Sequence, residues 1–194
     1  MSVSPARYSA VAIVLHWLIA ALILTNIGLA WWFDTLPRIE QVAPTQLHKS
    51  IGITVLILTL VRIAWRFVRR PPPMAPVGAP WERRLAQAVH VLLYALMLGL
   101  PLTGWAMVSA SRLIHAFPVT LYGLVQWPTI DYLASLPQPQ MRQAHEVFEF
   151  SHHLLAKAAY GLIVLHVGAA LMHQFVRRDG VLARMVPFIG ARAA

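Results

Sequence analysis

Residues 152–166 read HHLLAKAAYGLIVLH, and they lie in a longer apolar run that predicts a helix from about Gln143 to Val176. His152 and His166 are fourteen residues apart in this helix. Fourteen residues make four helical turns to within about 40°, so the two imidazoles face the same way, about 21 Å apart along the axis.

The composition excludes most classes of soluble protein. Of the 194 residues, 58% are hydrophobic and only 12% are charged, whereas soluble domains carry about 25% charged residues. The net charge of +9 would suggest nucleic acid in a soluble protein. Most arginines here flank long apolar runs, so we expect a lipid bilayer as the partner and no nucleic acid. The chain lacks cysteine, which excludes disulfides, cysteine-ligated iron–sulfur clusters and covalent haem attachment through cysteine.

The apolar runs predict an all-α integral membrane protein, a four-transmembrane-helix bundle. A helix that crosses a bilayer needs about 20 mostly apolar residues. Such helices are expected at about 8–33, 46–67, 85–111 and 143–176, and Pro101 should kink the third. Residues 1–194 are therefore interpreted as a single membrane domain.

Arginine placement predicts the orientation of the bundle. Basic residues concentrate in the cytoplasmic flanks of membrane helices. We therefore expect both termini in the cytoplasm, with the chain crossing the membrane several times. The loop of residues 112–141, which contains several aromatic side chains, would form a lid over the outer end. The arginines assigned to the cytoplasmic side are Arg7, Arg66, Arg69, Arg70, Arg83, Arg84, Arg177, Arg178, Arg184 and Arg192.

Four of the nine histidines form two pairs, and the members of each pair lie at similar depth. His16 and His166 lie roughly 13 and 16 Å from the cytoplasmic flank of their helices. His48 opens the second helix on the outer side, and His152 lies early in the last helix on that side. Ionisable residues inside a bilayer are costly, so each is by default a candidate for function.

This pattern favours two b haems inside the bundle, each held between imidazoles from facing helices. Zinc would gather its ligands around one point, often with a carboxylate, and a proton relay would use Asp or Glu. Neither arrangement is present in the predicted membrane core. Small residues would let the flat macrocycle approach the backbone. The helix glycines that could do so are Gly28, Gly52, Gly104, Gly161 and Gly168.

Several segments carry a resemblance to a known family. They are VLHWLI around His16, QLHKSIGI around His48, HVLLYALMLGLPLTGW from His90, HHLLAKAAYGLIVLH ending at His166, and the loop FPVTLYGLVQWP. Together they resemble bacterial cytochrome b561 over nearly the whole chain. That family is related to the cytochrome b subunits of hydrogenases and formate dehydrogenase.

The resemblance implies that His16 and His166 ligate the iron of the inner haem, and that His48 and His152 ligate that of the outer haem. The family has a superoxide oxidase branch, which takes electrons from periplasmic superoxide and passes them through both haems to ubiquinone. We expect this superoxide:ubiquinone oxidoreductase activity here. The alternatives are a cytochrome b subunit that links a separate dehydrogenase or hydrogenase to the quinone pool, and a haem-free transporter. A homo-oligomer or a complex with a redox partner protein is compatible with the sequence.

The remaining polar residues receive secondary assignments. His90, near the inner end of the third helix, competes with His16 as a ligand and is otherwise a haem or quinone neighbour. His173 could hydrogen-bond a quinone carbonyl, and Arg62 could bind a haem propionate or snorkel. His153 points about 100° away from His152, and His145 and His115 are expected to be structural or solvated.

Basic residues near the outer haem could steer superoxide, which is an anion. Lys49 adjoins His48, Lys157 follows His152 by five residues, and Arg112 begins the lid. Pairing with haem propionates, or with the nearby glutamates, is the alternative role for these cations.

Overall fold

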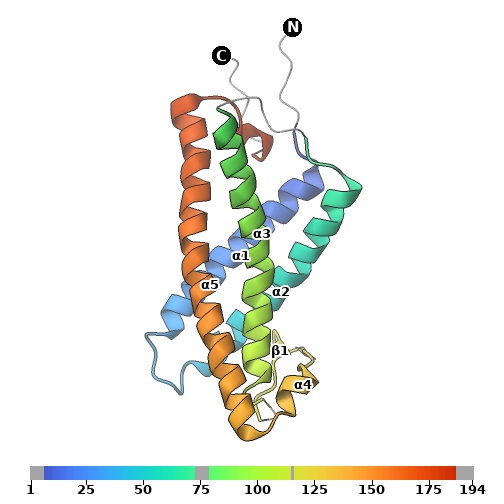
Figure 1. Cartoon of the computed structure of the whole chain (residues 1–194), viewed down its shortest axis with the longest axis vertical. Helices are drawn as coiled ribbons and strands as arrows, with labels where there is room; N and C mark the ends of the chain where they lie inside the picture. The colour runs from blue at the N-terminus through green and yellow to red at the C-terminus, as the bar shows by residue number, and fades with distance from the viewer. Residues whose placement is uncertain (1–6, 73–78, 115, 187–194) are drawn as a thin grey trace.

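The computed structural model describes residues 7–72, 79–114 and 116–186, and it is mostly helical (Figure 1). Within these residues, four helices are long and apolar enough to cross a membrane. They are α1 (Ala10–Phe33), α2 (Val42–Val68), α3 (Pro80–Ser109) and α5 (Gln138–Met172). The four-helix membrane fold expected from the sequence is therefore confirmed.

The helices α2, α3 and α5 begin four to five residues earlier than the apolar runs predict. A proline lies in the first turn of each: Pro44, Pro80 and Pro139. Proline suits this position because the first N–H groups of a helix have no partner within the helix. In α3, the Ala79 N–H also donates to Glu82 Oε2 at 3.1 Å. The helix continues through the buried Pro101 to Ser109.

The four long helices form two packed pairs. Helix α1 packs on α2, α3 packs on α5, and α2 joins the pairs through its contact with α3 (Figure 1). Ile19 of α1 is buried with Ile51 and Val55 of α2 in one apolar cluster. In the part of the chain that the structure describes, α1 and α5 are not packed closely backbone to backbone. The helices that carry His16 and His166 therefore meet through side chains, which include the Trp31 and Tyr160 rings with centroids 5.7 Å apart.

The loop between α3 and α5 folds into a lid over one end of the bundle, here called the lid end. It contains the hairpin of β1 (Thr120–Leu121) and β2 (Val125–Gln126), followed by α4 (Asp131–Ala134). The buried Ser50 of α2 accepts from the Tyr122 N–H at 3.0 Å, and its own hydroxyl can donate to Thr120 O. Trp105 Nε1 donates to Pro128 O at 2.8 Å. These bonds attach the lid to both α2 and α3.

The opposite end of the bundle, here called the arginine-rich end, is closed by the segment that follows α5. The π-helical turn η1 (His173–Arg177) and the 3₁₀ turn η2 (Leu182–Arg184) form this segment. Trp17 Nε1 donates to Met185 O at 2.9 Å, and the Tyr8 N–H donates to Arg184 O at 3.4 Å. Arg177 forms two hydrogen bonds with Glu82 at 2.6 and 2.8 Å. The first and last described segments therefore meet at the same end, as four membrane crossings require.

Candidate functional site

Two pairs of imidazoles join α5 to the α1–α2 pair of helices, one pair at each level of the bundle. The rings of His16 on α1 and His166 on α5 have centroids 6.2 Å apart. The rings of His48 on α2 and His152 on α5 have centroids 6.3 Å apart. The first pair lies toward the arginine-rich end and the second toward the lid end. Helix α5 thus contributes one histidine to each pair, which are the pairs that depth along the sequence predicts.

These separations suit a metal ion bound between the rings. A metal–imidazole nitrogen bond is about 2 Å long, and the ring centroid lies about 1 Å behind that nitrogen. Two imidazoles on opposite sides of one ion therefore have centroids about 6 Å apart. Among the described residues, no group of three or more His, Cys, Asp or Glu side chains could hold a metal ion. Haem fits paired histidines because its macrocycle supplies the other ligands of the iron.

Hydrogen bonds fix the orientation of the pair at the lid end. His48 Nδ1 lies 3.3 Å from Asn26 O, and His152 Nδ1 lies 3.0 Å from Leu100 O. A carbonyl oxygen can only accept, so each Nδ1 carries the proton and donates it. Nε2 of both rings is then left with the lone pair that binds a metal. These two imidazoles are oriented for coordination by the backbones of α1 and α3.

Helix α3 also shapes the position of the His152 ring. Thr103 Oγ1 lies 3.3 Å from His152 Nδ1 and donates its own proton to Gly99 O or Leu100 O. A Cβ placed on Gly104 would lie 3.2 Å from His152 Cε1. Sequence reasoning missed Thr103 as a ring-orienting residue, because its role depends on how α3 is rotated against α5.

The pair at the arginine-rich end has a different environment. Within the described segments, neither His16 nor His166 makes a hydrogen bond to a protein atom that meets the usual distance and angle limits. His90 stands against His166 with a centroid separation of 5.4 Å, shorter than for the two bridging pairs. His90 Nδ1 donates to Ala86 O at 2.7 Å, one turn back in its own helix. Arg62 lies close enough to His16 and His166 for its positive charge to act on both imidazoles.

Besides His90, three described histidines belong to neither pair. His173 Nδ1 donates to Asp179 Oδ2 at 2.5 Å in the segment after α5. His145 Nδ1 donates to Met107 O at 2.9 Å and so joins α5 to α3. His153 is exposed, next to His152 on the same helix. His115 and Arg192 lie outside the described residues.

The three cations predicted to steer an anion occupy different places. Lys49 is half-buried and acts electrostatically on His48. Lys157 is exposed and, at 100° per residue, points about 140° away from His152 around α5. No ion pair holds either lysine within the described residues.

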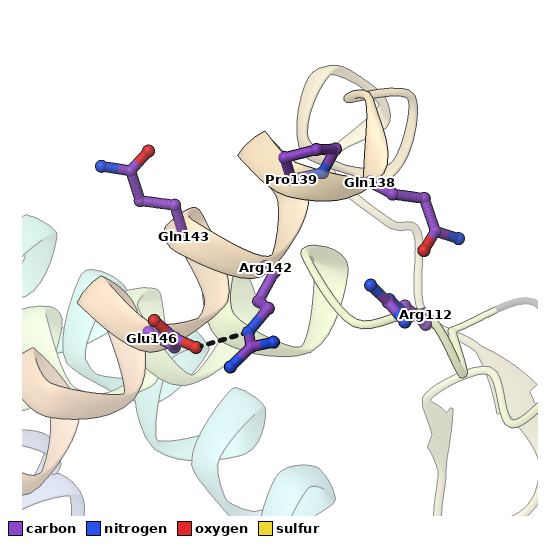
Figure 2. Close-up of a pocket in the computed structure, with 6 residues that line it drawn as sticks. All are labelled: Arg112, Gln138, Pro139, Arg142, Gln143 and Glu146. Atoms are coloured by element: carbon purple, nitrogen blue, oxygen red, sulfur yellow. Dashed lines mark hydrogen bonds and ion pairs between the residues drawn. The ribbon is translucent and has the colours of Figure 1, made fainter.

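Arg112 lies at a surface depression of about 500 Å³ at the lid end (Figure 2). Arg142 and Glu146 share this depression and bond to each other at 2.8 Å. Arg142 precedes His152 by ten residues, about 15 Å along α5. The structure thus brings Lys49 to an imidazole pair and leaves Lys157 and Arg112 further away.

Of the five helix glycines expected to admit a macrocycle, Gly104 touches an imidazole in this structure. Gly161 and Gly168 lie on the face of α5 opposite His152 and His166 by helical geometry. A Cβ added to either would meet nothing within 4 Å. The structure therefore does not place these two glycines beside the imidazoles.

Comparison with known proteins identifies related chains. The family model described as "Prokaryotic cytochrome b561" matches residues 7–188. "Cytochrome b561 homolog 2" of Escherichia coli is 29% identical over 94% of this chain and 93% of its own length. "Probable superoxide oxidase CybB" of Yersinia pestis is 30% identical over 93% of this chain and 96% of its own. "Cytochrome b562" of Cereibacter sphaeroides is 30% identical over 92% of this chain and 94% of its own.

The contact between Gly104 and His152 gives a first prediction. Gly104→Ala places a methyl group 3.2 Å from His152 Cε1, and such overpacking costs about 1–3 kcal/mol. We expect the variant to lose part of its haem during purification. The haem-to-polypeptide ratio, measured with pyridine haemochrome, reports this loss.

Gly168→Ala is the matched control, because its added methyl group meets nothing within 4 Å. It should keep the haem content of the unmodified protein. Equal haem content in both variants would contradict the role given to Gly104.

Proposed function

The chain belongs to the prokaryotic cytochrome b561 family and is therefore an electron-transfer protein of the bacterial inner membrane; we propose that it is a superoxide oxidase that reduces ubiquinone. The observation that carries this proposal is the placement of two imidazole pairs at two levels of one membrane bundle. A relative named as a probable superoxide oxidase, similar over nearly the full length of both chains, supports the choice of substrate.

The reaction balances with two superoxide anions for each quinone. Each superoxide loses one electron and becomes dioxygen. Ubiquinone gains the two electrons and takes up two protons, which makes ubiquinol. Two b haems, when bound, would supply one-electron carriers between the two ends of the bundle.

In this proposal, His48 and His152 hold the haem at the lid end, and His16 and His166 hold the haem at the arginine-rich end. Both members of the first pair keep Nε2 available, since their Nδ1 atoms donate to carbonyl oxygens. His16 is preferred to His90 as the partner of His166, because the His16–His166 separation equals that of the other pair to within 0.1 Å.

Superoxide is proposed to arrive at the lid end, which faces the periplasm if the arginine-rich end faces the cytoplasm. Lys49 follows His48 in α2 and has no carboxylate partner within the described residues. A half-buried cation attracts a small anion more strongly than an exposed one, because water screens it less. Lys49 is therefore the proposed steering residue. Lys157 and Arg112 are further from the imidazoles and receive no such role.

The quinone is proposed to bind toward the arginine-rich end, where two histidines could serve proton uptake. His173 is hydrogen-bonded to Asp179, and this pair can hold a proton at Nδ1. His90 keeps Nε2 free, since its Nδ1 donates to Ala86 O. Arg62 donates from Nε to the Tyr94 hydroxyl at 2.9 Å. It lies near the imidazole pair of His16 and His166.

The direct test supplies superoxide to purified protein and follows the quinone. We expect haem reduction by superoxide and then reduction of a short-chain ubiquinone, with two superoxide anions consumed for each ubiquinol. Haem reduction without quinone reduction would contradict the proposal. Co-purification with a soluble dehydrogenase, together with little activity alone, would instead indicate the electron-transfer subunit.

The role of Lys49 is tested by its charge. In Lys49→Gln, we expect the rate of haem reduction by superoxide to fall about three- to tenfold at low ionic strength. The difference should shrink as salt is added, because ions screen the attraction. Stopped-flow absorbance measures this rate.

Lys157→Gln removes the same charge from an exposed position on the far face of α5. It should change the rate less than twofold. Equal rates for the two variants, or a difference that salt leaves unchanged, would exclude steering by Lys49.

A further inference from the structure

A basic pocket lies at the arginine-rich end of the bundle. It is a pocket of about 310 Å³ between the start of α1, the end of α2 and the middle of α3. Tyr8, Trp65 and Tyr94 supply aromatic walls. Five arginines line it, and they are Arg7, Arg62, Arg66, Arg69 and Arg70.

None of the described residues that line the pocket carries a negative charge. No carboxylate is among its lining residues, and no ion pair reaches these five arginines within the described chain. On the other side of the same end, Arg177 is paired with Glu82, and His173 with Asp179. Like charges gathered at one place repel each other, so an anion bound among them is strongly favoured.

The arginines are arranged by depth along the end of α2. Arg62 is the deepest and is already bonded to the Tyr94 hydroxyl and to Ala12 O. Arg69 follows it by seven residues, about 10 Å nearer the end of the helix. Arg66, Arg69 and Arg70 are exposed. The guanidinium groups of Arg66, Arg69 and Arg70 therefore lie where the apolar span of α2 ends.

This level matches the position of lipid headgroups. Trp65 Nε1 donates to Ser9 Oγ at 3.0 Å, and tryptophan and tyrosine are enriched at membrane–water interfaces. Guanidinium groups bind phosphate oxygens in pairs, with two parallel hydrogen bonds. Basic pockets between membrane helices at the cytoplasmic side are suited to anionic lipid headgroups.

We propose that this pocket binds the phosphate headgroup of an anionic phospholipid. The lipid occupies the leaflet at the arginine-rich end, with its phosphate between Arg66, Arg69 and Arg70 and its chains along the bundle. Haem propionates share the same anionic oxygen chemistry, and the experiment separates the two sources. The proposal does not depend on superoxide or ubiquinone as substrates.

The test compares two pairs of consecutive arginines, both at the same end of the protein. Arg69→Gln/Arg70→Gln removes two charges from the pocket. Arg83→Gln/Arg84→Gln removes two charges from exposed positions at the start of α3, outside the pocket. Each purified protein is titrated with phosphatidylglycerol or phosphatidylcholine in neutral detergent, and native mass spectrometry counts the bound lipids.

We expect one saturable phosphatidylglycerol site per chain and at least tenfold weaker binding of phosphatidylcholine. The pocket variant should lose at least tenfold in phosphatidylglycerol affinity, and the α3 variant less than twofold. Equal losses in the two variants, or equal affinity for the two lipids, would overturn the proposal. Loss of haem from the pocket variant with unchanged lipid binding would do so too, and would assign the arginines to haem propionates.

Arg69→Lys/Arg70→Lys keeps the charge that sets membrane orientation, so it decides the question if the glutamine variant does not fold. Lysine cannot form the paired hydrogen bonds of arginine. We expect at least threefold weaker phosphatidylglycerol binding. Unchanged binding in this variant would count against a specific phosphate site.

Discussion

Two polar imidazoles on one face of a membrane helix constrain the rest of the structure. His152 and His166 lie four turns apart on α5, and a bilayer offers no water to satisfy them. Each meets an imidazole from another helix, His48 on α2 and His16 on α1. Helices α1 and α5 remain apart at the backbone, and direct packing of the two would leave less room for a group between the imidazoles.

The two ends of the bundle stabilise their polar groups in different ways. At the lid end, the carbonyls of Asn26 and Leu100 orient the imidazoles, and Ser50 attaches the lid through backbone groups. At the arginine-rich end, ion pairs neutralise the α3–α5 side, while the α1–α2 side keeps an unneutralised cluster of arginines. In the proposed function, electrons pass from the lid end, where carbonyl oxygens orient the imidazoles, to the arginine-rich end.

The sequence predicts the four helices because each requires only a long run of apolar residues. It predicts the two histidine pairs because depth follows directly from counting residues at a fixed rise. It misses the starts of α2, α3 and α5 at Val42, Pro80 and Gln138, because the first turns of these helices lie outside the apolar runs. Those turns are stabilised by the backbone conformation of proline and, in α3, by the hydrogen bond from the Ala79 N–H to Glu82. A hydropathy pattern reports neither.

Other features depend on how one helix is rotated against another, and the spacing of residues along the sequence does not predict that rotation. The contact of Gly104 with His152 is one example, and the hydrogen bond to the Leu100 carbonyl is another, since every residue has such a carbonyl. The positions of Gly161, Gly168 and Lys157 relative to His152 and His166, by contrast, follow from the angular spacing of residues along α5 itself.

The most direct test of this account counts haems in purified protein and in single histidine variants. We predict two b haems per chain in the unmodified protein and one in each of His152→Ala and His166→Ala. His153→Ala, the adjacent control, should retain two. A single haem in the unmodified protein, or two haems remaining after either ligand replacement, would contradict the claim that α5 supplies an axial imidazole to each of two irons.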